Sequence, residues 1–162
     1  IGGNKAEEAY DEGSIGIISK SGGMTTETAQ VVQNSGFGIS TAMDIGGDKI
    51  AGTTFVEALE MFEEDDQTEA VVIFGELGGT YENQIAEFIE DNPDFSLPVV
   101  AFITGEFTES MPTQQYGHAG AVIRGDRDRP SHKKKVLRDA GVRVADVHHE
   151  IGSELEELLE KK

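Results

Sequence analysis

The 162-residue sequence contains no cysteine, few basic residues and no long hydrophobic run. The lack of cysteine excludes disulfide bonds and thiolate metal ligands. No apolar stretch approaches the ~20 residues of a membrane-spanning helix, and no basic segment followed by an apolar one opens the chain. These absences predict a protein without a membrane segment, which we expect in the cytoplasm. The chain begins Ile1-Gly2 rather than with methionine, which indicates a piece of a longer polypeptide.

Acidic side chains outnumber basic ones by 31 to 13, which gives a net charge of −18. A surface potential of that sign repels nucleic acids and anionic membranes, so neither is an expected partner. Two interpretations of the acidity stay open. The carboxylates either form an ordinary solvated surface or adapt the protein to high salt, where screening relieves the repulsion between them.

Short apolar segments alternate with amphipathic ones along a chain of single-domain length. The expected strands are 14–18, 38–43, 70–74, 98–103 and 142–144, and the expected helices are 24–34, 53–62, 80–90, 131–140 and 151–159. This alternation predicts an α/β fold, a flavodoxin-like three-layer, doubly wound, mostly parallel sheet with helices on both faces. Residues 1–12 are polar and glycine-bearing and are interpreted as a linker stub before a domain at 13–162.

Capping residues set the expected helix ends. Thr53 or Thr54 can cap the second helix and Ser131 the fourth, because a hydroxyl accepts a hydrogen bond from the first helical turn. Gly36 and Gly141 are expected to end the helices that precede them.

One histidine stands between two glycines in the segment Tyr-Gly-His-Ala-Gly-Ala at 116–121. Flanking glycines let the backbone turn sharply and let a bulky group approach the ring of His118. An imidazole there can act as a general base, a metal ligand or a nucleophile. A lone histidine is more often structural, so this motif by itself leaves these alternatives open.

Two further loops follow expected strands and belong to the same sheet edge. Glu76 ends the most apolar strand, and its carboxylate can accept a hydrogen bond from one imidazole nitrogen and leave the other as nucleophile. Ser21, Gly22 and Gly23 form a turn that enters a helix, where free amides and the helix dipole favour a phosphate or carboxylate. An ordinary exposed glutamate and a simple tight turn are the alternatives.

The other histidines carry no pattern of this kind. His132 lies in a His-Lys-Lys-Lys run, and His148 and His149 precede the last helix. We expect all three on the solvated surface, and no ligand spacing such as HExxH supports a metal.

Four motifs together resemble one family. They are Ser-Lys-Ser-Gly-Gly at 19–23, Ile-Gly-Gly-Asp at 45–48, Gly-Glu-Leu-Gly-Gly at 75–79 and Gly-His-Ala-Gly-Ala at 117–121. Their order and spacing resemble the C-terminal ligase domain of the succinyl-CoA synthetase α subunit, a module shared with ATP-citrate lyase. The resemblance covers the chain from Gly13 to its end.

The resemblance implies a transient phosphohistidine at His118, with its ring held by Glu76 and its phosphate bound by Ser21, Gly22 and Gly23. It implies a citric acid cycle type of ligase that converts an acid, CoA and a nucleoside triphosphate into acyl-CoA, nucleoside diphosphate and phosphate through an acyl phosphate.

The resemblance also implies groups that this chain does not carry. CoA and ATP or ADP with Mg²⁺ are expected to bind mostly outside it, on a CoA-binding Rossmann domain and an ATP-grasp β subunit or domain. Met-Pro-Thr-Gln-Gln-Tyr at 111–116 lacks the Lys and Arg usual in succinyl-CoA synthetases, so the di- or tricarboxylate substrate stays open between succinate and citrate. A second interpretation is a non-catalytic flavodoxin-like module that binds an anion or a partner.

Overall fold

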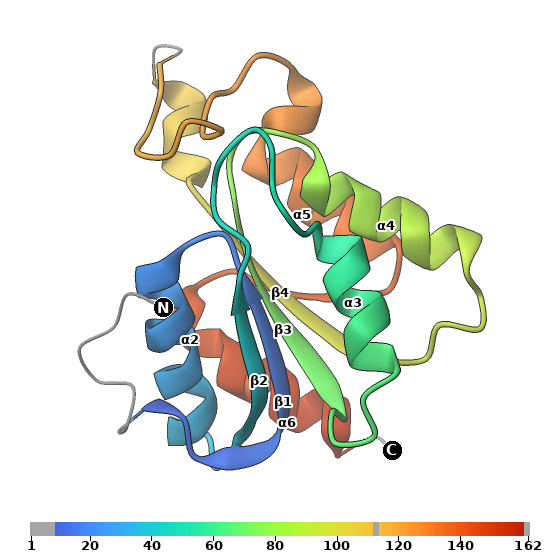
Figure 1. Ribbon diagram of the computed structural model, residues 1–162. Coiled ribbons are helices and arrows are strands. Elements are labelled where there is room, and N and C mark those ends of the chain that lie inside the picture. Colours follow the sequence, from blue (N-terminus) through green and yellow to red (C-terminus); the bar gives the residue numbers. More distant parts are fainter. Residues whose placement is uncertain (1–8, 112–113, 161–162) are drawn as a thin grey trace.

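The computed structural model describes residues 9–111 and 114–160 and shows one parallel sheet between two helical layers (Figure 1). The strands are β1 (Glu12–Ser19), β2 (Ile39–Asp44), β3 (Ala70–Glu76), β4 (Val99–Thr104) and β5 (Arg143–Ala145). The helices are α2 (Gly22–Asn34), α3 (Phe55–Glu63), α4 (Tyr81–Asp91), α5 (Pro130–Asp139) and α6 (Ile151–Leu159), with short 3₁₀ turns η1 (Glu106–Ser110), η2 (Asp126–Asp128) and η3 (His148–Glu150).

The strand order is β2-β1-β3-β4-β5, the order of flavodoxin-like doubly wound sheets. The predicted fold class is therefore confirmed. β3 lies at the centre and all seven of its residues are buried, as expected of a strand covered on both faces.

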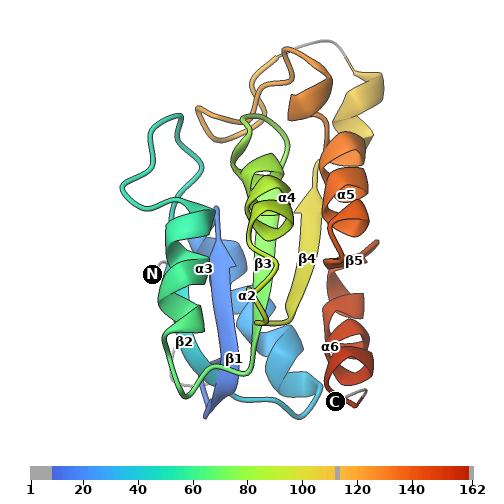
Figure 2. The same ribbon diagram turned by 90° about the vertical axis from the view of Figure 1, so that its right-hand side faces the viewer.

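Two apolar clusters fill the spaces between the layers. Helices α3, α4 and α5 cover one face of the sheet, with Phe55, Leu59, Ile85 and Leu137 buried against it. Helices α2 and α6 cover the other face (Figure 2). Within residues 9–111 and 114–160, no helix has both the length and the apolar composition needed to cross a membrane.

Local capping chemistry explains several of the helix ends. Thr54 caps α3 and forms a reciprocal capping box with Glu57, as the hydroxyl pattern predicts. Gly36 and Gly141 adopt φ values of +85° and +89° just beyond α2 and α5, in the left-handed region that favours glycine.

The prediction that Ser131 caps the fourth helix is wrong. The helix begins one residue earlier at Pro130, which needs no amide hydrogen at a first helical position. Ser131 lies inside the helix, and its amide and hydroxyl both donate to the carboxylate of Glu109 at 2.8 Å.

The linker predicted at 1–12 falls mostly outside the described residues, which begin at Ala9. Ala9 is buried and Tyr10 packs beside it against the α2 and α6 cluster, while β1 already begins at Glu12. The division into a linker and a domain at 13–162 stays a prediction.

Candidate active site

The candidate site lies beyond the carboxyl ends of β1 and β3, where the strand order of the sheet reverses. At this point the connections leave the sheet on opposite faces and open a crevice, which is where ligands bind in doubly wound folds. β1 ends at Ser19 and β3 at Glu76, and the two strands are neighbours in the sheet. The loop that carries His118 folds over the same end of the sheet (Figure 2).

The structure brings His118 and Glu76 together although they lie far apart in the sequence. Nδ1 of His118 lies 3.0 Å from Oε1 and 2.9 Å from Oε2 of Glu76. An ionised carboxylate only accepts hydrogen bonds, so Nδ1 donates to it, and in the neutral form of the ring Nε2 then keeps its lone pair. The Glu76 side chain is 8 % exposed and the His118 side chain 42 % exposed. The pair thus has a buried orienting group and an accessible ring.

Backbone hydrogen bonds fix the loop that presents this ring. The Ala121 amide donates to the His118 carbonyl, and the Gly120 amide donates to the Gly47 carbonyl, each at 3.0 Å. Gly78 adopts φ +82°, and a Cβ there would lie 2.1 Å from the Gly120 carbonyl oxygen. Only glycine allows this approach, so the turn after β3 and the histidine loop pack backbone to backbone.

Burial raises the pKa of the Glu76 carboxyl above its ordinary value. The hydrogen bond and electrostatic interaction with His118 and the positive charge of Lys20 act in the opposite direction, and the nearby Glu82 carboxylate adds to the rise. A carboxylate that is costly to bury and retained beside an imidazole is typical of functional sites.

Gly47 lies directly against the pair. A Cβ on this residue would lie 2.3 Å from Nδ1 of His118 and 2.5 Å from Oε1 of Glu76, while its φ is outside the left-handed region. We therefore expect Gly47→Ala to separate ring from carboxylate by steric conflict alone, at a cost of about 1–3 kcal/mol in unfolding free energy. Urea unfolding and NMR of the His118 ring nitrogens would measure both effects.

Gly52→Ala is the matched control for this substitution. Gly52 lies in the same connection between β2 and α3, and a Cβ there meets no atom within 4 Å. Unchanged ring signals in Gly47→Ala, with Gly52→Ala also unchanged, would contradict the tight packing.

The predicted anion cradle lies on the neighbouring turn between β1 and α2. Ser21 caps α2 by accepting from the Met24 amide at 3.4 Å, and the Ser19 hydroxyl donates to the Ser21 carbonyl. The Ser19 hydroxyl is thus used within the turn, and the amides of Gly22 and Gly23 are the groups left to face an anion. A Cβ on Gly23 would meet nothing within 4 Å, so this helix start is open to a ligand.

The His118 ring hydrogen-bonds to Glu76, and its loop is joined to the Gly47 loop through the Gly120 amide; neither contact involves the cradle. The cradle shares the sheet edge with the pair, one strand away. The binding role of Ser21, Gly22 and Gly23, and the chemical roles of His118 and Glu76, stay predictions.

Sequence reasoning missed three buried charged residues beneath the site, Lys20, Glu82 and Lys133. Lys20 Nζ lies 2.7 Å from Oε1 of Glu82, and Lys133 Nζ lies 2.6 Å from its Oε2. For Glu82 and Lys133 the helical spacing carried a signal, because Glu82 stands three residues before the buried Ile85 and Lys133 four residues before the buried Leu137.

A cavity of about 340 Å³ opens next to this cluster. Its wall includes Lys20, Lys49 and Arg124 together with Asp48 and Asp128. Three cations against two carboxylates make this wall less negative than the protein as a whole, whose net charge is −18.

The surface prediction for His148 is wrong. Its Nε2 lies 3.0 Å from the Thr28 hydroxyl, and its ring packs edge-on against Phe74 and Phe102. Burial lowers its pKa, and the neighbouring Glu27 carboxylate opposes this. The imidazole therefore serves as a packed ring between α2 and the sheet.

The other predicted surface histidines differ from each other. His149 is exposed and His132 is half-buried. In the run of lysines that follows His132, Lys133 and Lys134 are buried. Across residues 9–111 and 114–160, no three His, Asp or Glu side chains gather as a metal-ligand set.

Comparisons with known proteins support one family. The profile described as CoA-ligase matches residues 18–143. The chain is 42 % identical over 154 residues to the α subunit 1 of an ADP-forming succinate–CoA ligase of Archaeoglobus fulgidus, covering 95 % of this chain and 51 % of that protein. It is 41 % identical over 152 residues to an ADP-forming sulfoacetate–CoA ligase subunit of an Acholeplasma species, covering 94 % and 50 %. The chain thus spans about half the length of these relatives.

Solved structures agree with this. The ATP citrate lyase of Methanothrix soehngenii, solved in complex with citrate and coenzyme A, superposes with a TM-score of 0.85 and 27 % identity over 93 % of this chain and 24 % of that one. A dinucleotide-forming acetyl-coenzyme A synthetase of Ca. Korarchaeum cryptofilum shares the fold with a TM-score of 0.59, at 20 % identity over 84 % of this chain and 28 % of that one. With its profile match over most of its length and its relatives above 40 % identity, the chain belongs to the CoA-ligase family.

Proposed function

We propose that this chain is the phosphohistidine-bearing domain of a nucleoside-diphosphate-forming acyl-CoA synthetase, of the succinyl-CoA synthetase or ATP-citrate lyase type. The observation that carries the proposal is the contact of both Glu76 oxygens with Nδ1 of His118. This contact selects the tautomer whose Nε2 is an unprotonated nucleophile on a partly exposed ring.

The proposed synthesis of the acyl-CoA proceeds in three steps. Nε2 of His118 attacks the γ-phosphorus of the nucleotide; the P–N bond forms, the bond to the bridging oxygen breaks and the diphosphate leaves. A substrate carboxylate then attacks the same phosphorus, so that the P–N bond breaks and an acyl phosphate forms. The CoA thiolate attacks the acyl carbon and releases phosphate. Glu76 keeps its hydrogen bond to Nδ1 throughout and stabilises the positive charge that the ring gains.

The start of α2 would bind the transferred phosphoryl group. The Gly22 and Gly23 amides and the helix dipole act on its dianion, with the Ser21 hydroxyl at the same end. Phosphoryl transfer depends mainly on such positioning and charge stabilisation.

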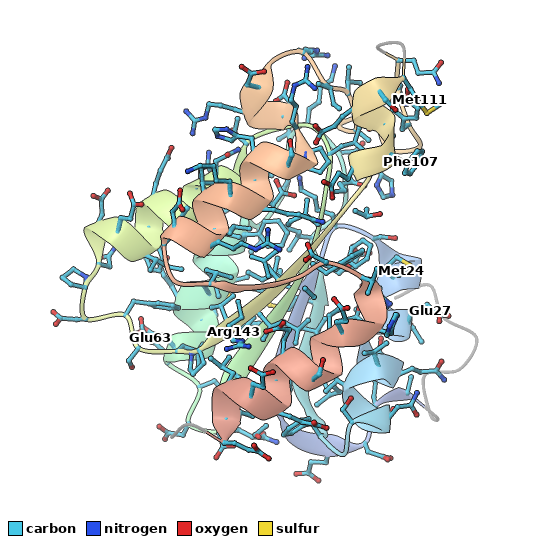
Figure 3. All side chains as sticks on the ribbon, turned by 180° about the vertical axis from the view of Figure 1, so that it is seen from behind. Met24, Glu27, Glu63, Phe107, Met111 and Arg143 are labelled. Carbon is cyan, nitrogen blue, oxygen red and sulfur yellow. The ribbon has the colours of Figure 1, made fainter. Side chains whose placement is uncertain are left out.

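The remaining groups would come from outside this chain, since it spans about half of its relatives. We assign CoA to a Rossmann domain and the nucleotide, with Mg²⁺, to an ATP-grasp β subunit or domain. Phe107 (70 % exposed) and Met111 (45 % exposed) project from η1 and its end, at the end of the molecule beyond the strands (Figure 3). We place the contact with the partner at this end of the molecule. The acid would be succinate or citrate, and the compartment the cytoplasm.

Radiolabelling tests this function. The chain, mixed with an ATP-grasp partner subunit and γ-labelled ATP, should take up a label that is stable to base and labile to acid. ³¹P NMR should place it on Nε2 of His118. His118→Asn should take up no label, whereas His149→Asn, which removes an exposed imidazole, should label like the wild type.

Three other outcomes would overturn the proposal. Labelling of His118→Asn would place the phosphoryl group elsewhere. A wild-type chain that stays unlabelled with the partner, while it binds CoA by calorimetry, would make it the CoA-binding half of the enzyme; a chain that does neither would be the non-catalytic module.

A further inference from the structure

One carboxylate, that of Glu82, joins three segments beneath the candidate site. Its side chain is fully buried on the first turn of α4 and contacts the ammonium groups of Lys20 and Lys133. Lys20 directly follows β1 and precedes the N-cap of α2, and Lys133 comes from α5. Glu82, on α4, therefore connects this helix both to the segment that carries the predicted phosphate cradle and to α5.

This cluster also binds both backbone polar groups of Glu76. The Glu76 amide donates to Oε1 of Glu82 at 3.1 Å. Lys133 Nζ donates to the Glu76 carbonyl at 2.8 Å and to the Gly78 carbonyl at 2.6 Å. The residue that orients the histidine ring is thus held by side chains from two helices, beyond the hydrogen bonds of its own strand.

Glycine at position 75 makes this arrangement possible. A Cβ there would lie 2.9 Å from Cγ and 3.0 Å from Oε1 of Glu82. The bare backbone lets the Glu82 side chain lie across the end of β3 and reach the Glu76 amide.

Stability alone is a poor reason for such a cluster. Burial of charged groups costs several kcal/mol per ion, and a well-packed apolar replacement is often as stable. The three charges sum to +1, and the nearby Glu76 carboxylate balances them. Burial raises the pKa of that carboxyl and Glu82 adds to the rise, while Lys20 opposes both and favours the ionised form needed at Nδ1. The hydrogen bonds of the cluster to the backbone of Glu76 instead suit a role in holding this residue in place.

We propose that Glu82 and Lys133 are positioning residues that hold Glu76 and, through it, set the tautomer of His118. This inference rests on the proposed function for its kinetic consequence, but the ring tautomer can be measured on the chain alone.

The test is Lys133→Met, with Lys134→Met as the matched control. Methionine keeps the length of the side chain, removes both donations to the β3 end and leaves Lys20 and Glu82 as a neutral pair. Lys134 is the next residue on α5, is also buried, and pairs with Glu106 at 2.7 Å without touching Glu76. Glu82→Asp, which keeps the charge and withdraws the carboxylate by one methylene, is a second variant in case Lys133→Met folds poorly.

Long-range ¹H–¹⁵N spectra of the His118 ring should show mainly the Nδ1–H tautomer in the wild type and in Lys134→Met. In Lys133→Met and Glu82→Asp we expect at least a twofold loss of that tautomer. With the partner subunit, the labelling rate should fall about tenfold at unchanged KM for ATP.

Wild-type ring spectra in Lys133→Met and Glu82→Asp would overturn the positioning role, whatever the kinetics. An unlabelled wild-type chain would instead count against the proposed function. If the tautomer still shifts in such a chain, the positioning role stands by itself.

Discussion

Replacement of Glu76 by glutamine is expected to slow phosphorylation of His118 by about 10²- to 10⁴-fold. The amide can present its NH₂ group to Nδ1, which places the imidazole proton on Nε2 and removes the nucleophilic lone pair. The amide also cannot stabilise the positive charge that the ring gains during attack. Single-turnover labelling with the partner subunit, at saturating ATP, would measure this rate.

The same variant should fold at least as stably as the wild type at neutral pH. The pKa of the Glu76 carboxyl is raised in the fold, so the folded state holds this proton more tightly than the unfolded chain does. That contribution to stability is full below the pKa of the unfolded chain and is lost as the pH rises through the raised pKa. Glutamine removes the cost of the buried charge, and urea unfolding at neutral pH would show no loss.

Glu27→Gln is the matched control for Glu76→Gln. Glu27 is exposed in the first turns of α2 and is labelled in Figure 3, so its substitution removes the same charge near the same end of the molecule. Labelling of both variants at the wild-type rate would refute the orienting role of Glu76. Slow labelling of both variants would show that the loss of a negative charge, rather than the contact with Nδ1, lowers the rate.

The sheet was predictable because its strands carry a strong local signal. Val71, Val72 and Ile73 are apolar and β-branched on both faces, as buried parallel strands require, and α6 has the predicted bounds of 151–159. Errors arose where two local signals competed. Ser131 is a good N-cap residue, but Pro130 starts the helix and tertiary contacts with Glu109 use the serine.

The contact between His118 and Glu76 was predictable in kind, because the carboxyl ends of parallel strands meet at one edge of the sheet. The buried cluster was not. Lys133 follows a histidine and precedes two more lysines, a run that is normally solvated. Its burial depends on Glu82, 51 residues away, and a pair of that separation leaves no local pattern. The apolar spacing of each helix shows only which face is buried.

The paired lysines also explain why Glu82 is charged in the fold. Burial alone would raise the pKa of this carboxyl, but Lys20 and Lys133 more than offset the burial and hold the pKa below its ordinary value. Burial lowers the pKa of Lys133, and Glu82 partly restores it. Glu82 and Lys133 therefore stabilise each other's charged form, and removal of the Glu82 carboxylate should destabilise the whole cluster.

Glu82→Gln should lower the free energy of unfolding by about 3–5 kcal/mol, because two buried ammonium groups lose their common counter-charge. Glu87→Gln is the control on the same helix. Glu87 pairs with Arg127 at the surface, with both side chains more than half exposed, so its loss should cost less than about 1 kcal/mol. Urea unfolding of both variants at neutral pH measures the difference, and equal costs would contradict a tightly coupled cluster.

The deficit of Glu82→Gln should also shrink as the pH rises. A lysine whose pKa is lowered in the fold releases its proton at lower pH than the unfolded chain does, so stability increases with pH between the two values. Without Glu82 the pKa of Lys133 falls further and this interval widens. At about pH 9.5 the difference in unfolding free energy between Glu82→Gln and the wild type should therefore be smaller than at neutral pH. A difference that does not depend on pH would show that the loss comes from packing and hydrogen bonds instead.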